Sequence, residues 1–482
     1  MRNEKPLQRE SIINYWKSRR DHDAEERAHS LFWEKANDIL NNASAYERPE
    51  PVFHVGVEVE YSLMNPELEQ VTEPLRDSVI TRASELYGGQ QQLFDCELGA
   101  SQIELRTPTP PAKDLRRDGI GGFLDEVKGL EGALMSSVRE NGINLLRCGT
   151  NPFVDVETIE RTTAPKYWDL PNFHDHYKRF PDGSPDTRIG TSQPVEVGGA
   201  DIISLCNSVQ FILDCRDFDD AIAKLNRALM ITPFISSICA NARFLDGKDT
   251  ELADIRMIAW EISHDVRMPT EILERNPQRV GLPDAYFVDL KDYFNRVSSY
   301  PFILRPDNAD AAFGIALGIY WCDARIKFNF KAHRALLEFR PLSVQPSLEE
   351  DAAAMVFFLG RLIWSQESGE RLLDLGLVRQ NRYAALRHGL NTDLWWVDNG
   401  KFRKDDARRV IQREMTRAKI GLESMGLWDE SSKTVLALLE ARLQEGTPSD
   451  RLALAVQKHV SQGMTTRDAL ESAVTDLHLI WS

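Results

Sequence analysis

The sequence of 482 residues lacks several patterns that mark common classes of protein. None of its six cysteines forms a C-x-x-C pair, so the spacing indicates neither a zinc site nor a thioredoxin-like redox centre. No run of 18 or more apolar residues occurs, so we expect no membrane span. The first ten residues, MRNEKPLQRE, are charged and have no apolar signal core. Together with cysteines that lie in apolar runs, this predicts a cytoplasmic location.

Glycine-rich nucleotide-binding motifs are also missing. The sequence has no G-x-x-x-x-G-K-[ST] segment and no protein-kinase motif set. The glycines in residues 119–122 lack the full G-x-G-x-x-G spacing and a preceding strand, so they predict a kink in a helix. Any nucleotide must therefore be held by another arrangement of residues.

The charge balance excludes one class of partner. A net charge of −16 argues against a general nucleic-acid-binding surface, although single nucleotides can still bind through Mg²⁺ bridges. The 42% hydrophobic and 27% charged composition is typical of a soluble globular protein with one large domain or two ordinary ones.

The most informative segment is Phe53–Leu63, with the sequence FHVGVEVEYSL. Apolar and polar residues alternate throughout, which predicts a half-buried β-strand with Glu58 and Glu60 on the same face. Gly56 lies on that face too, which would let a ligand approach the backbone. A divalent metal with bound phosphate explains these choices, but so does a solvated face of an antiparallel sheet.

Further strands carry polar residues in the same way. We predict strands over residues 101–107 and 203–214, and a hairpin of residues 325–330 and 335–340 that ends at Pro341. The residues that share a polar face on these strands are Gln102, Glu104 and Arg106, then Ser208 and Gln210, and finally Glu338 and Arg340. Taken singly, each has an ordinary alternative as a solvated or cross-strand-bonded residue.

The remaining chain suggests three parts. Residues 1–50 read as an N-terminal helical segment, 51–365 as the catalytic domain, and 366–482 as an α-helical region without strands that packs on it. Residues 155–200 form a long loop that contains His174 and His176, which we interpret as lining a substrate site without metal.

If the polar faces of the four strands align, their carboxylates converge in one place. Such a cluster is unstable unless cations compensate it. Mg²⁺ or Mn²⁺ prefers these hard oxygen ligands and leaves coordination sites for triphosphate oxygens. The pattern therefore predicts metal-assisted phosphoryl transfer.

Several motifs occur in the order found in one known family. These are GVEVEY at 56–61, ELGASQIELRTPTP at 97–110, CNSVQFILD at 206–214, Asn241 followed by Arg256, EFRPLSVQPS at 338–347 and NRYAALRHGL at 381–390. In this order they resemble the glutamate–cysteine ligase family, including its carboxylate–amine ligase branch.

The resemblance implies an α+β, glutamine-synthetase-like fold, with a curved and mainly antiparallel sheet backed by helices. It also implies ATP, Mg²⁺ or Mn²⁺, and an acyl-phosphate route that joins a glutamate-like acid to an amine. Neither nucleic acid nor membrane is an implied partner, and the oligomeric state stays open. The implied roles are metal ligands for Glu58, Glu60, Glu104, Gln210 and Glu338, catalysis and phosphate binding for Arg256 and Arg340, and cofactor binding for Asn241.

Three functions are compatible with this pattern. The first is an ATP-dependent ligase that forms a γ-glutamyl or related amide. The second is a phosphotransferase on the same fold with a stable phosphorylated product, and the third is a non-catalytic nucleotide-binding relative. The family's Asn-Ser-Pro turn is replaced by residues 241–243, with the sequence NAR, which argues against cysteine as the acceptor.

Overall fold

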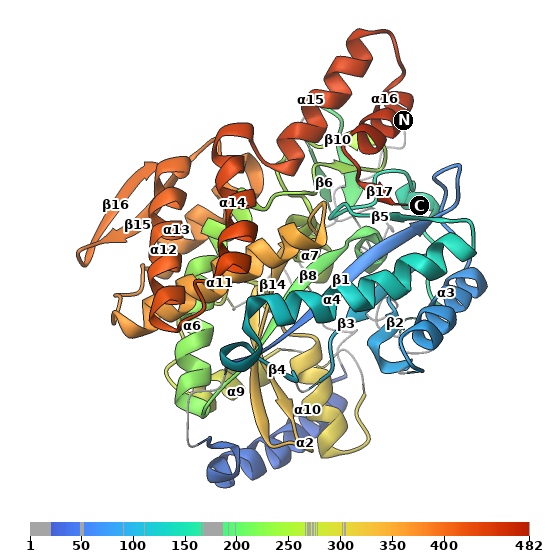
Figure 1. Ribbon diagram of the computed structural model, residues 1–482. Coiled ribbons are helices and arrows are strands. Elements are labelled where there is room, and N and C mark those ends of the chain that lie inside the picture. Colours follow the sequence, from blue (N-terminus) through green and yellow to red (C-terminus); the bar gives the residue numbers. More distant parts are fainter. Residues whose placement is uncertain are drawn as a thin grey trace, which may run out of the picture.

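The structure, a computed structural model, is an α+β fold built on one antiparallel sheet (Figure 1). It describes residues 21–48, 53–89, 91–109, 111–164, 167, 187–190, 192–197, 199–265, 267, 271, 274, 276, 278–300, 302 and 305–481. His174 and His176 lie outside these residues. Within them the sheet has nine strands, and its main path runs β13-β14-β8-β1-β3-β2.

Strand β1 (His54–Met64) is the centre of the sheet, as its alternating sequence predicts. It pairs in antiparallel fashion with β3 (Gln102–Arg106) along one edge and β8 (Ser208–Asp214) along the other. Beyond these, β4 (Lys113–Asp114) and β5 (Asn144–Leu146) pair with its two ends. Strand β2 (Phe94–Cys96) then lies beside β3.

The other end of the sheet differs from the prediction in two respects. Strand β8 begins at Ser208 rather than at residue 203, because Ala200–Leu205 forms a 3-10 helix, η4. The hairpin of β13 (Ala324–Asn329) and β14 (Arg334–Ser343) is confirmed, but β14 continues past Pro341. A register shift against β8 between Phe339 and Leu342 accommodates the proline, whose nitrogen donates no hydrogen bond.

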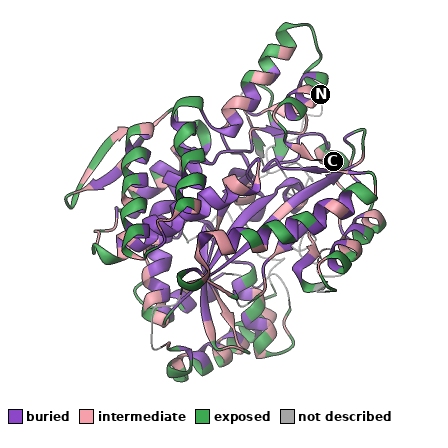
Figure 2. Ribbon diagram, in the orientation of Figure 1, coloured by how far each residue is buried: buried purple, intermediate pink, exposed green. Residues whose placement is uncertain are grey.

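Long helices cover the apolar face of the sheet. Helix α4 (Leu115–Glu140) crosses in front of β1 in Figure 1, and it has the predicted break at Gly119, where φ is +67°. Helix α11 (Leu348–Glu367) packs against both α4 and α6 (Phe218–Ile238), and it begins after the Ser347 cap, as the sequence predicts. Figure 2 shows that these helices and the strands form the buried interior.

Further helices pack around this body. Helix α2 (His22–Asn41) packs with α10 (Ala309–Gly318) and α9 (Leu290–Ser298) at the bottom of Figure 1. Helix α7 (Arg256–His264) packs beside η4, and α3 (Glu73–Leu86) packs on α4. The smaller elements are η1 (Ala43–Tyr46), η2 (Gln91–Leu93), η3 (Val156–Thr158), β6 (Thr187–Ile189), β7 (Val195–Val197), β9 (Phe244–Leu245), β10 (Lys248–Asp249), β11 (Val280–Gly281) and β12 (Trp321–Cys322).

The region after residue 366 is mostly helical, but the prediction that it has no strands is wrong. Its helices are α12 (Leu375–His388), α13 (Ala407–Ser424), α14 (Glu430–Glu445), α15 (Pro448–Ser461) and α16 (Thr466–Asp476). Strands β15 (Asp393–Asp398) and β16 (Lys401–Asp406) form a hairpin whose turn residues, Asn399 and Gly400, both have positive φ. Strand β17 (Ile480–Trp481) pairs with β5 and so joins the central sheet.

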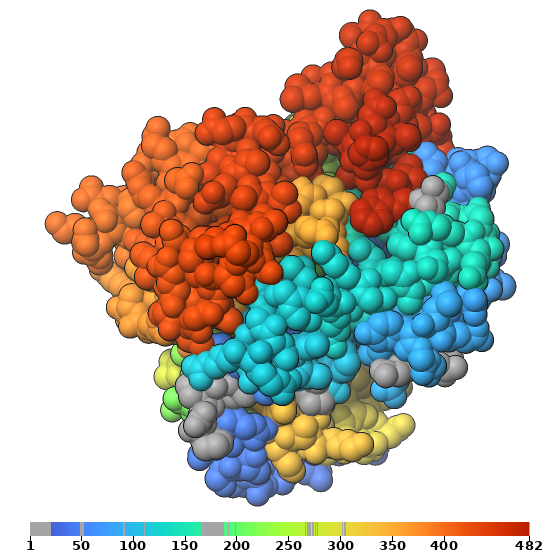
Figure 3. Space-filling model, in the orientation of Figure 1, coloured from blue at the N-terminus to red at the C-terminus, as the bar shows by residue number. Residues whose placement is uncertain are grey.

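This C-terminal region packs on the rest of the molecule. In Figure 3 its orange and red surface lies directly against the teal surface of α4. Helices α15 and α16 extend away from the body at the top of Figure 1.

The division into residues 1–50, 51–365 and 366–482 stays a prediction. Among the described residues, no helix is both long and apolar enough to cross a membrane.

Candidate active site

The polar faces of four strands meet in one cavity of about 430 Å³. Its lining includes eight side chains that the sequence places on polar strand faces, namely Glu58, Glu60, Gln102, Glu104, Arg106, Gln210, Glu338 and Arg340. Glu58 and Glu104 are 8% and 6% exposed, and Glu338 is fully buried. The alternative of an open, solvated sheet face is therefore wrong, because most of this charge lies out of water.

Three carboxylates in the cavity lie close enough together to hold a metal ion. Oxygen atoms of Glu60, Glu97 and Glu104 all lie within 4.8 Å of one another. Glu97 comes from the turn between β2 and β3, so the strand pattern did not identify it. Burial raises the pKa of Glu104 well above its usual value, and the nearby charges of Glu58, Glu97 and Glu60 raise it further. Hard oxygen donors with excess negative charge fit Mg²⁺ or Mn²⁺.

Glu60 is held in place by the neighbouring strand β8. One of its carboxylate oxygens accepts a hydrogen bond of 2.8 Å from the backbone nitrogen of Ser208, and the other accepts one of 3.1 Å from Nε2 of Gln210. Burial raises the pKa of Glu60, although Arg256 and the Ser208 hydrogen bonds oppose the increase. Gln210 therefore orients a carboxylate of the trio, and its role as a metal ligand stays a prediction.

Glu338, in contrast, has cationic partners within the protein. Arg325 and Lys327 of β13 both form ion pairs with its carboxylate, and Lys327 Nζ also lies 3.4 Å from Glu58 Oε1. Burial alone would raise the pKa of Glu338, but these two cations and Arg340 lower it below the usual value. Sequence reasoning did not assign either β13 cation to the site.

Arg340 offers a hydrogen-bond donor to the cavity. Its Nη1 forms a long ion pair of 3.8 Å with Glu338 Oε2, and it has no hydrogen-bond partner among the described residues. Burial, together with the nearby charge of Arg325, lowers the pKa of Arg340 to about 10. A buried guanidinium with a free N–H suits an anionic group of a substrate.

Two predicted site residues lie behind the cavity. Arg256 Nη2 donates a 3.1 Å hydrogen bond to the backbone oxygen of Arg340, so it supports that strand from outside the lining. Asn241 is buried, and its Nδ2 donates to the backbone oxygens of Arg147 and Val344 at 3.1 and 2.7 Å. Both contacts are architectural, and the role of Asn241 in cofactor binding stays a prediction.

Gly56 does not leave room for a ligand. A Cβ atom on this residue would lie 2.8 Å from Oγ1 of Thr107, which itself accepts a hydrogen bond from the backbone nitrogen of Val57. The space beside Gly56 is thus filled by the protein, and the expected approach of a ligand there is wrong.

A second, larger cavity of about 860 Å³ adjoins the first. The two share Glu58, Arg106, Gly318, Arg325 and Lys327. The far part of the larger cavity is lined by phenylalanines, including Phe313, Phe328 and Phe330. An apolar, aromatic compartment therefore opens onto the charged end of the acidic cavity.

Comparison with known proteins places this geometry in a family. The sequence model of glutamate-cysteine ligase family 2 matches residues 54–474, which is most of the chain. The chain belongs to glutamate-cysteine ligase family 2. The match extends through the C-terminal helices, beyond the segment of residues 53–390 that carries the motif resemblance. It confirms the predicted family and the prediction of a ligase-type enzyme.

Curated relatives of this family member are distant but extensive. The proteins provisionally named glutamate–cysteine ligase 2 from Solibacter usitatus and Rhodopirellula baltica are 22% and 24% identical to the chain. These alignments cover 83% and 82% of the chain and 88% and 91% of the relatives. A protein of the same name from Gloeobacter violaceus is 24% identical over 288 residues, which is 58% of the chain and 63% of that protein.

Solved structures show a similar fold. The glutamate–cysteine ligase of Francisella tularensis, determined in complex with AMP, has a TM-score of 0.56 to this family member at 11% identity. The superposition covers 90% of each chain. The likeness confirms the predicted glutamine-synthetase-like fold, with its curved antiparallel sheet and backing helices.

Proposed function

We propose that this protein is an ATP- and Mg²⁺-dependent carboxylate–amine ligase that activates the γ-carboxylate of glutamate or of a similar acid. One observation carries the proposal: acidic side chains from separate strands and from the β2–β3 turn line one cavity, and carboxylate oxygens of Glu60, Glu97 and Glu104 lie there within 4.8 Å of one another. A structural cluster of this kind would be costly unless a ligand compensated it.

The carboxylates of Glu60, Glu97 and Glu104 would hold the metal, with Glu58, Gln210 and Glu338 as further oxygen ligands nearby. Bound Mg²⁺ or Mn²⁺ supplies charge neutralisation for the phosphate oxygens of the nucleotide. Two cationic side chains of the protein would act beside the metal. Lys327 and Arg325 lie where the two cavities join, so they are suited to contact the phosphates of ATP.

The larger cavity is suited to the nucleotide base and ribose. Its aromatic lining supports stacking of a purine, and the complex of the Francisella tularensis ligase with AMP supports an adenine nucleotide for this fold. The triphosphate would then extend toward Glu58 and the acidic cavity, where the acid substrate binds.

The reaction that suits this site has two steps. A γ-carboxylate oxygen of the acid attacks the terminal phosphorus of ATP, the bond to the bridging oxygen breaks, and ADP leaves. The amine nitrogen then attacks the acyl carbon, the bond to the phosphate oxygen breaks, and an amide and inorganic phosphate form. Arg340, supported by Arg256, would donate a hydrogen bond to the negative charge that moves through these steps.

The decisive experiment is an assay of ADP and phosphate release with glutamate, ATP and Mg²⁺. We expect release that depends on an added amine, with formation of a γ-glutamyl amide detected by mass spectrometry. Hydroxylamine serves as a small general acceptor that would trap the acyl phosphate as a hydroxamate. ADP release without any amine, together with a stable phosphorylated product, would instead identify a phosphotransferase.

Lys327 gives the proposal a second test. Replacement by methionine removes a cation from the junction of the two cavities, so the KM for ATP should rise about tenfold, the value expected for a lost hydrogen bond to a charged group. The KM for glutamate should change much less. Lys401→Met, at the exposed first residue of β16, is the matched control.

A further inference from the structure

The acidic cavity has an apolar wall as well as a charged one. Trp260 of α7 and Trp321 of β12 line it together with Leu98, Ile203, Ile315 and Ile319. The ring centroids of the two tryptophans are 5.5 Å apart and their planes meet at 55°. Neither metal binding nor phosphoryl transfer requires such a wall, so it must be explained by another ligand.

The surrounding residues hold both tryptophans in place. The ring of His264 is fully buried and lies 4.6 Å from the Trp260 ring and 4.5 Å from the Trp321 ring. Nδ1 of this histidine lies 2.7 Å from Ser263 Oγ, and the Arg279 guanidinium lies 5.2 Å from the centre of the Trp321 ring. Side chains fixed in this way form a preorganised binding surface.

The identity of the ligand follows from the other parts of the site, if the proposed function holds. The nucleotide has its own aromatic compartment in the larger cavity. A glutamate-like acid is charged at both ends, so its binding requires ionic partners such as Arg340. The amine is then the substrate whose non-reacting part remains for the apolar wall.

The charges of the lining also limit the class of amine. The described cations that line the cavity are Arg106, Arg325, Lys327 and Arg340. All four have a carboxylate partner, which is Glu104 and Asp95 for Arg106 and Glu338 for the other three, with Arg340 the most distant at 3.8 Å. Because the substrate acid requires Arg340, an acceptor that carries its own carboxylate would find only more closely paired cations among the described lining residues.

We propose that Trp260 and Trp321 bind the body of the acceptor, and that the acceptor is a primary amine with an apolar or aromatic group and no carboxylate. A protonated amine is attracted to the face of a tryptophan ring and to a nearby carboxylate such as Glu97 before it loses its proton. The wall therefore selects the acceptor by hydrophobic contact and by cation–π attraction.

A panel of acceptors tests the class of amine directly. With saturating glutamate, ATP and Mg²⁺, we expect kcat/KM for benzylamine and isopentylamine to exceed that for cysteine and glycine by about tenfold or more, from the apolar contact alone. A higher kcat/KM for cysteine than for both apolar amines would overturn the inference.

Substitutions test the assignment of the wall. Trp260→Ala should raise the KM for benzylamine about tenfold while the KM values for glutamate and ATP stay within about twofold. Trp260→Phe should keep most of the affinity for benzylamine. Trp395→Ala on β15 should leave the KM for benzylamine unchanged. Equal loss for all three substrates would overturn the assignment, and Trp321→Phe repeats the test if Trp260→Ala does not fold.

Hydroxylamine separates failure of this inference from failure of the proposed function. It has no apolar body, so hydroxamate formation reports the activated acid alone and should fall much less than benzylamide formation in Trp260→Ala. Hydroxamate formation without use of any apolar amine would overturn the acceptor class and leave the ligase intact. Absence of both hydroxamate and amide would overturn the proposed function and this inference together.

Discussion

Glu60 and Tyr61 are neighbours on β1, yet they point into two buried charge clusters of opposite character. On the Tyr61 side, Arg147 donates to the tyrosine hydroxyl at 3.2 Å, to Asp351 Oδ2 at 2.9 Å, and to Glu131. On the Glu60 side, carboxylate oxygens of Glu60, Glu97 and Glu104 lie within 4.8 Å of one another, and the partly exposed Arg106 pairs with Glu104 at 3.3 Å. One strand thus separates a cluster built around a fully buried arginine from a carboxylate cluster whose paired arginine is partly exposed.

The difference indicates which cluster is architecture and which is a site. Arg147 is completely buried and its partners come from α4 and α11, so the network joins the sheet to the helices behind it. The acidic trio instead lines a cavity, where a cation from solution can compensate it. A carboxylate cluster that lines a cavity is therefore the stronger sign of function.

The largest expected effect comes from removal of Arg147, the cation of the cluster on the Tyr61 side of β1. Arg147→Met leaves Glu131 and Asp351 buried without their cation, and it should lower the free energy of unfolding by about 3–5 kcal/mol. Chemical denaturation in urea measures the change. Arg82→Met removes a cation from an exposed ion pair with Glu140 and should leave the denaturation midpoint nearly unchanged. Equal effects of the two variants would remove the contrast between the clusters.

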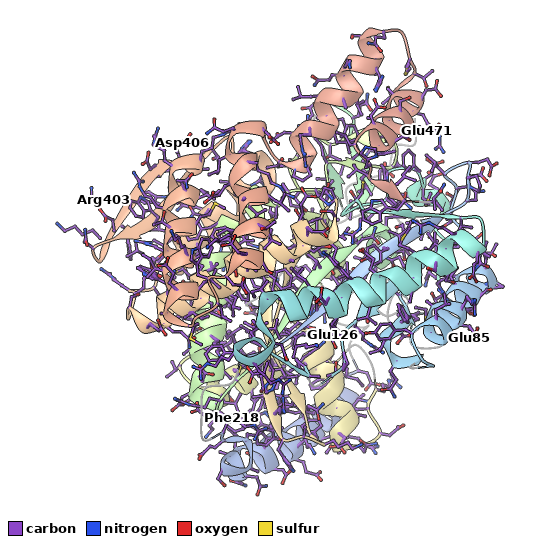
Figure 4. The ribbon with its side chains drawn as sticks, viewed as in Figure 1. Glu85, Glu126, Phe218, Arg403, Asp406 and Glu471 are labelled. Atoms are coloured by element: carbon purple, nitrogen blue, oxygen red, sulfur yellow. The ribbon has the colours of Figure 1, made fainter. Side chains whose placement is uncertain are left out.

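Substitutions in the acidic trio of Glu60, Glu97 and Glu104 should change activity rather than stability. Glu104→Gln and Glu97→Gln should each lower kcat/KM by about 100-fold, while the metal-free protein becomes no less stable because like-charge repulsion is relieved. Steady-state rates and thermal unfolding without metal measure the two effects. Glu126→Gln on α4, labelled in Figure 4, replaces a carboxylate on a helix of the opposite face and should change neither. A loss of stability equal to that of Arg147→Met would contradict the interpretation.

The last effect depends on pH and concerns a proton on Asp351, the partner of Arg147. Burial raises the pKa of Asp351 from 3.8 to about 7, although Arg147 opposes the increase. A carboxyl with a raised pKa in the folded state stabilises the protein below pH 3.8, and this contribution is lost as the pH rises to about 7. Asp351→Asn cannot ionise, so its free energy of unfolding should increase relative to the unmodified protein from pH 4 to pH 7. Exposed Asp393→Asn should show no such trend.

Much of the site could be predicted because strands place alternate residues on one face. The alternation in Phe53–Leu63 fixed the direction of Glu58 and Glu60, and the same argument applied to Glu104, Gln210 and Glu338. The hairpin register also brings Arg325 opposite Glu338, so the ion pair was implicit in the predicted strands. It was not identified, because cross-strand partners depend on register, which residue patterns leave undefined.

The parts that sequence reasoning missed depend on loops and on long-range packing. Glu97 lies in a turn, where no periodicity fixes the direction of a side chain, and Trp260 and Trp321 meet through elements far apart in the chain. The β15–β16 hairpin had a signal, the Asn399–Gly400 pair, but the surrounding helical stripes concealed it. Pro341 was interpreted as a strand end, whereas a bulge accommodates it.

The pairing of β17 with β5 has a consequence for synthesis of the protein. Strand β1 and its first partners leave the ribosome long before residues 480–481 are made, and translation proceeds at roughly 5–20 residues per second. The edge of β5 that β17 covers thus stays unpaired for on the order of tens of seconds, during which it can bind a chaperone or another nascent chain.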